Sequence, residues 1–79
     1  MAFAESETEW AERVARHLKA ELKRADVTYE ELALRLKEQG FDETKASIAN
    51  KLSRATLSAH FFLASLAAIG RYNLRVDDI

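Results

Sequence analysis

The sequence predicts an all-α fold, a compact four-helix domain followed by a short extended C-terminal segment. The chain has 79 residues, no proline and only two glycines, so little interrupts its helices. With 48% hydrophobic and 32% charged residues, its composition is typical of a folded globular chain. Apolar residues recur at helical spacing in four segments, and helix-capping residue types flank them. We therefore expect a single domain over residues 1–79.

The first helix is expected over residues 8–25. Ser6 and Glu9 have the spacing of a capping box, in which each side chain accepts a hydrogen bond from the other residue's backbone amide. Four apolar residues then recur at every fourth position and form one stripe along the helix, namely Trp10, Val14, Leu18 and Leu22.

The second helix is expected over residues 28–39. Thr28 and Glu31 form another capping box and define its start. Gly40 is expected to end it, because glycine adopts the left-handed conformation that commonly closes a helix.

The third helix is expected over residues 42–53, with Asp42 as its N-cap. Ile48 and Leu52 lie on the same side of this helix and are expected to face the core. The opposite side carries small and polar residues and no large apolar side chain. This helix is therefore expected to leave one face open to a ligand or to solvent.

The fourth helix is expected over residues 58–69, between an N-cap at Ser58 and Gly70. Its apolar residues cover most of its circumference, which is typical of a helix central to a core or shared with a partner subunit. In the tail, residues 71–77, apolar and polar residues alternate as they do in a β-strand. Such a strand must dock on the helices or pair with a second copy.

Charge is unevenly distributed along the chain. The formal net charge is −1, yet residues 44–75 contain no acid and carry Lys45, Lys51, Arg54, Arg71 and Arg75. Attraction to a polyanion depends on the local potential rather than on the net charge. The stretch is compatible with one nucleic-acid-binding face, and equally with an ordinary solvated surface.

Several classes of function are not expected from this sequence. It has no cysteine, so disulfides, thiolate metal sites and cysteine nucleophiles are excluded. His17 and His60 lack further ligands at metal-binding spacing, and no nucleophile motif or phosphate-binding glycine loop is present. We expect no enzyme, no cofactor, no metal and no small-molecule ligand. Without a signal peptide or an apolar span, we expect a cytoplasmic protein that does not enter membranes.

The middle of the chain resembles the helix-turn-helix of the lambda-repressor and Cro family of bacterial and phage regulators. The matching segments are Thr28-Tyr29-Glu30-Glu31-Leu32-Ala33, Gly40-Phe41, Ser53-Arg54-Ala55-Thr56-Leu57-Ser58 and Leu66-Ala67-Ala68-Ile69-Gly70. The sequence departs from the family pattern at residues 37–39, which lengthen the second helix, and at Ala55, where glycine is common. The resemblance covers about residues 22–70. It implies sequence-specific binding of double-stranded DNA by a small, nucleoid-associated transcriptional repressor.

The resemblance places the third helix in the major groove, which admits one α-helix. Short or forked polar side chains on its outer side are expected to contact bases, namely Thr44, Ser47, Asn50, Lys51 and Arg54. A second set is expected to contact phosphates, namely Lys45, Ser58, His60 and Lys23.

A homodimer is expected, because two recognition helices on a palindromic site multiply affinity. The residues expected at its interface are Phe62, Leu66, Ile69, Tyr72 and Leu74. The alternative hypothesis is a helical protein–protein interaction module, such as an antitoxin or adaptor. In that case the third helix is only a solvated face and the fourth helix makes the contact.

Overall fold

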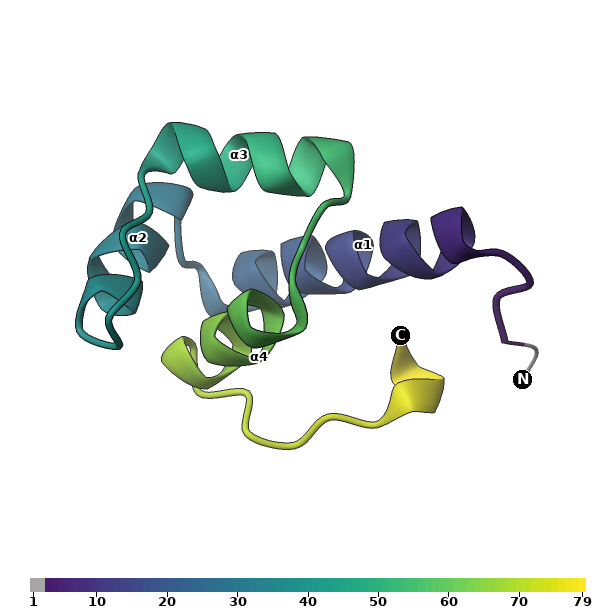
Figure 1. Ribbon diagram of the computed structural model, residues 1–79. Coiled ribbons are helices and arrows are strands. Elements are labelled where there is room, and N and C mark those ends of the chain that lie inside the picture. The colour runs from purple at the N-terminus through teal and green to yellow at the C-terminus, as the bar shows by residue number, and fades with distance from the viewer. Residues whose placement is uncertain (1–2) are drawn as a thin grey trace.

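A computed structural model describes residues 3–79 and confirms the all-α prediction. The described part of the chain contains four α-helices and no strand, and Figure 1 shows their arrangement. Their bounds are Glu7–Ala25 for α1, Tyr29–Lys37 for α2, Lys45–Arg54 for α3 and Ala59–Ala68 for α4. A short 3₁₀ helix, η1, follows at Val76–Asp78.

Three of the expected N-caps are confirmed. The side chains of Ser6, Thr28 and Ser58 accept hydrogen bonds from the backbone amides of Glu9, Glu31 and Phe61, respectively. Each bond satisfies one of the amide groups that the first turn of a helix leaves without a partner.

The expected start of the third helix at Asp42 is wrong, because Thr44 is its N-cap. The Ser47 amide donates to Thr44 Oγ1 at 3.0 Å, and the Thr44 amide donates to Ser47 Oγ at 2.8 Å. This reciprocal pair satisfies two amides, whereas a lone Asp42 cap satisfies fewer. The second helix ends at Lys37 rather than at the expected residue 39, so residues 38–44 connect α2 to α3. Gly40 lies within this connection with a φ of +86°.

The hydrophobic core lies between α1 and α2, each of which packs against both α3 and α4. Leu18, Leu32, Leu36 and Ile48 are fully buried there. They come from three different helices, so a single core joins the helical elements. Burial of such apolar surface is the main force that holds a domain of this size together.

The fourth helix lies inside this core, which corrects the expected dimer interface. Phe62, Leu66 and Ile69 are only 6%, 3% and 6% exposed, because α1 and α2 cover them. Leu74 is half-buried against the same core, and only Tyr72 of the expected set is open, at 81% exposure. Side chains buried within one protomer are not available to a second one.

The expected C-terminal strand is wrong, because the described tail forms no strand. Of the two arrangements expected for this segment, docking on the helices is the one observed. The Arg71 amide donates to the Leu66 carbonyl at 2.9 Å, and Arg71 Nε donates to Glu21 Oε2 of α1 at 2.7 Å. The tail then runs back along the molecule, and its end lies against α1 (Figure 1). Throughout residues 3–79, no helix is long and apolar enough to cross a membrane.

Candidate nucleic-acid interface

The outer face of α3 is open and carries small polar side chains. Ile48 and Leu52 anchor the helix to the core and are at most 2% exposed. At about 100° per residue, the side opposite them carries Ala46, Asn50, Ser53 and Arg54, all of which are exposed. No bulky apolar residue stands on this face, so another molecule can approach the α3 backbone closely.

Asn50 and Arg54 are the expected base-contacting residues that the structure leaves free. Both are exposed, and neither has a hydrogen-bond or ion-pair partner within residues 3–79. They are four residues apart, so they lie on adjacent turns of one helix face. An asparagine amide pairs with adenine and an arginine guanidinium with guanine when either enters the major groove.

Ser47 and Lys51, also expected to contact bases, are occupied within the protein. Ser47 Oγ donates to Glu43 Oε1 at 2.6 Å, and Lys51 Nζ forms an ion pair with the other oxygen of the same carboxylate. The Lys51 ammonium also lies 4.7 Å from the centre of the Phe61 ring, within cation–π range. These contacts tie the start of α3 to its middle and to α4.

The Glu43 carboxyl is held in its charged form by the same contacts. Burial of its side chain, which is 9% exposed, tends to raise its pKa. The hydrogen bonds from Lys51 and Ser47, with the Lys51 charge, outweigh burial and place the pKa below its usual range. The charges of Glu43 and Lys51 therefore cancel locally.

The expected phosphate-contacting residues lie at three places, namely the last turn of α1, the first turn of α3 and the start of α4. Lys45 and Lys23 are exposed and have no ion-pair partner in the described chain. Ser58 and His60 lie at the start of α4, where Ser58 Oγ is 3.3 Å from His60 Nε2. The His60 ring stacks on Phe41 with centroids 6.1 Å apart.

The acid-free stretch is less basic in space than in sequence. Three of its five bases form ion pairs with acids that lie outside residues 44–75. The pairs are Lys51 with Glu43, Arg71 with Glu21 and Arg75 with Asp77. Lys45 and Arg54, near the two ends of α3, are the bases of this stretch that have no acid partner within residues 3–79. The free positive charge of this stretch is therefore concentrated on α3.

The structure adds residues of α1 that sequence analysis did not include. Arg16 and Lys19 are exposed and line a shallow hollow of about 300 Å³ against Leu52, Ser53 and Ala55 at the end of α3. Together with Lys23 they form what we call the α1 basic row. Their spacing of three and four residues was the available signal, because such residues share one side of a helix.

The hollow has opposite charges at its two ends. Glu12 lines the same hollow, and Glu7 and Glu12 line a neighbouring hollow beside Arg54. From Arg16 to Lys23, the charged residues on this side of α1 are all bases. The groove between α1 and α3 is therefore basic toward the C-terminal end of α1 and acidic toward its N-terminal end.

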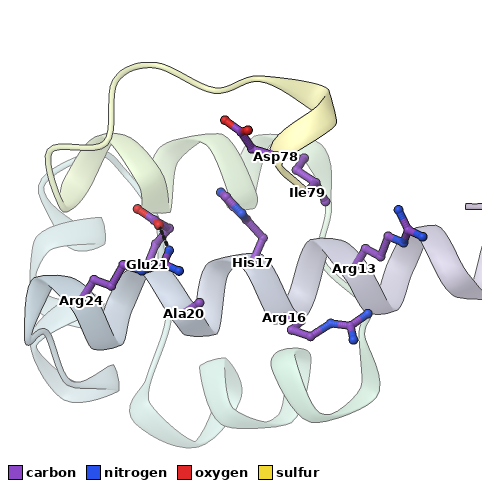
Figure 2. A pocket seen from close by; sticks show the side chains of 8 residues that line it. All are labelled: Arg13, Arg16, His17, Ala20, Glu21, Arg24, Asp78 and Ile79. Carbon is purple, nitrogen blue, oxygen red and sulfur yellow. Dashed lines mark hydrogen bonds and ion pairs between the residues drawn. The ribbon is translucent and has the colours of Figure 1, made fainter. Parts of the chain in front are cut away.

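A larger hollow of about 660 Å³ lies on the other side of α1, beneath the tail (Figure 2). Arg24 and Glu21 point toward each other there, and Arg71 also binds Glu21. Burial tends to raise the pKa of Glu21, but the hydrogen bonds from both arginines lower it below its usual range. The charges in this hollow are largely paired, so it offers a weaker anion site than α3. Its lining residues are Arg13, Arg16, His17, Ala20, Glu21, Arg24, Asp78 and Ile79.

No cluster of three or more potential metal ligands occurs in the described chain. A comparison with curated proteins gave no match, and a comparison with solved structures gave none either. The scan of protein families matched one family over residues 10–74, from the first turns of α1 to the middle of the tail. The chain therefore belongs to the family described as Domain of unknown function (DUF6471).

Proposed function

We propose that this protein binds double-stranded DNA in a sequence-dependent manner with α3 in the major groove. The observation that carries the proposal is the outer face of α3, where exposed Asn50 and Arg54 stand among small side chains. A bare polar helix face allows both close approach and specific hydrogen bonding to base edges. The biological role that fits is a small bacterial or phage transcriptional repressor in the cytoplasm, acting by occupying an operator.

The helix ends support the same placement. Lys45 in the first turn and Arg54 in the last turn are free cations separated by the length of α3. Because phosphate contacts position a protein on DNA, cations at both ends of an inserted helix would fix its register. Asn50 lies between them, where base edges are nearest.

The connection between α2 and α3 distinguishes this chain from the family that it resembles. A helix-turn-helix usually has a turn of roughly 3–4 residues, whereas residues 38–44 connect the helices here. The contact residues are therefore assigned from exposure and free polar groups on α3 rather than from positions in a motif.

The test is selection of bound sequences from a randomised duplex library, followed by fluorescence anisotropy with two matched variants. Asn50→Ala removes the amide from the α3 face, and Asn73→Ala removes an exposed amide from the tail. We expect Asn50→Ala to reduce the preference for the selected site by one base contact, about 1–3 kcal/mol, and Asn73→Ala to have no effect. Absence of any enriched sequence, or equal effects of the two variants, would refute the proposal.

A second candidate function rests on exposed apolar side chains outside α3. Leu63 on α4 is 53% exposed and Tyr72 in the tail is 81% exposed. Exposed aromatic and aliphatic side chains serve as anchors in protein interfaces, so they favour an interaction module or a dimer contact. An oligomer that Leu63→Ser dissociates, in a protein that enriches no DNA sequence, would support this function instead.

A further inference from the structure

The α1 basic row lies on one side of its helix. Arg16, Lys19 and Lys23 fall within a sector of about 60° at 3.6 residues per turn. All three are exposed and have no hydrogen-bond or ion-pair partner within residues 3–79. Free cations on one stripe of a helix are the simplest means of following a line of negative charges.

Two residues of the row border the end of α3. Arg16 and Lys19 line the hollow shared with the end of α3, and in Figure 2 Arg16 is directed away from the tail whereas His17 points toward it. The pairs that Glu21 makes with Arg24 and Arg71 lie on the tail side of α1, whereas the Glu9–Arg13 pair lies near Arg16 in the N-terminal half of the helix. Lys19 and Lys23 extend the row beyond the Glu9–Arg13 pair toward the C-terminus of α1.

The two helices lie side by side and run in opposite directions (Figure 1). Lys19 shares its hollow with Ser53 and Ala55 at the end of α3, and Lys23 lies one turn further along α1, in the direction of the first turn of α3. The acids Glu7 and Glu12 lie nearer the N-terminus of α1, and both line the hollow beside Arg54.

The spacing of packed helices matches the width of the major groove. Packed helix axes are about 8–10 Å apart, and the major groove of B-DNA is about 12 Å wide. With α3 in the groove, a helix that runs alongside it lies over one of the two phosphate strands that border the groove. Arg16 and Lys19, which border the end of α3, would then lie close to that strand.

We propose that Arg16, Lys19 and Lys23 form a phosphate-binding site that follows one strand of DNA while α3 occupies the adjacent major groove. This inference rests on the proposed function, and it specifies which flank of the molecule lies on the backbone. In this arrangement the acids Glu7 and Glu12 repel phosphate, so they direct the duplex toward Lys23.

The test compares the salt dependence of duplex binding by the wild type and by the double variant Lys19→Gln/Lys23→Gln. Each phosphate contact contributes about 0.9 to the slope of log affinity against log salt concentration. We expect the double variant to lower that slope by about 2 and to weaken binding equally on selected and unrelated duplexes. Lys37→Gln, which removes an equally exposed lysine from the end of α2, is the control and should leave the slope unchanged.

The outcomes separate this inference from the proposed function. If the wild type binds DNA and the double variant retains the full slope, the phosphate site on α1 is refuted while DNA binding by α3 stands. If the double variant changes the slope no more than Lys37→Gln does, the inference fails in the same way. If the wild type binds no duplex even at low salt, both are overturned. Far-UV circular dichroism should show unchanged folding, because all three lysines are exposed.

Discussion

Replacement of Ser65 by alanine should stabilise the protein. Ser65 is fully buried in α4, and its Oγ is the one buried side-chain polar atom in the described chain without a hydrogen-bond partner. A buried hydroxyl that lacks a partner costs about 1–3 kcal/mol. Alanine removes that penalty, has a slightly higher helix propensity and leaves only a very small void.

The expected gain in the free energy of unfolding is about 1–2 kcal/mol for Ser65→Ala, equivalent to a rise in Tm of about 5–10 °C for a domain of this size. Urea unfolding followed by far-UV circular dichroism measures it as a higher midpoint at an unchanged m-value. Ser53→Ala is the matched control, because Ser53 is exposed on α3 and reports helix propensity alone. A gain for Ser65→Ala no larger than that of the control would refute the reasoning.

Three further predictions concern the helix ends and the core. Glu43 has a lowered pKa in the fold, so its stabilising effect is complete above its unfolded pKa of about 4.3 and is lost as the pH falls through the lower folded value. Glu43→Gln should therefore lose less stability than the wild type as the pH is lowered, and urea unfolding at several pH values measures this difference. Ala55 ends α3 with a φ of +55°, which strains an L-residue, so Ala55→Gly should raise the free energy of unfolding by about 0.5 kcal/mol, and a lower midpoint would contradict this. Phe62→Ala should cost about 3–5 kcal/mol of stability, and a folded variant that changes only in oligomeric state would show that Phe62 lies at an interface after all.

The local features of the fold were predictable from the sequence because short-range interactions determine them. Capping residues such as Ser6 and Thr28 act on amides three residues away, and the apolar stripe of α1 is a periodic pattern. The start of α3 was missed because Asp42 is a good cap in isolation. The reciprocal hydrogen bonds of Thr44 and Ser47 satisfy more backbone amides than a lone Asp42 cap. Ser47 is not the glutamate or glutamine that usually completes a capping box, so the sequence did not indicate this pair.

The errors concern what each element packs against. The apolar circumference of α4 predicts burial but does not show whether α1 and α2 or a second copy covers Phe62. Likewise, the alternation of residues 71–77 predicts a strand only where a neighbouring strand exists. With none available, the tail is held by Arg71 on Glu21 and ends in a 3₁₀ helix.

The candidate site was predictable in composition and not in detail. The small polar face of α3 followed from helical periodicity, and Asn50 and Arg54 lie on it as expected. Lys51 is not available on that face because it pairs with Glu43. The charge of Arg71 is neutralised by Glu21, which is 50 residues away in the sequence. Such pairings arise from tertiary structure, which one sequence does not reveal.

The central claim is that DNA binds along α3 and the α1 basic row, and an NMR titration of isotope-labelled protein with duplex DNA at low salt tests it most directly. The account predicts that chemical-shift changes concentrate on the exposed residues of α3, around Asn50 and Arg54, and on α1 near Lys19 and Lys23. Changes confined to α4 and the tail, or a spectrum that duplex DNA leaves unchanged, would contradict it.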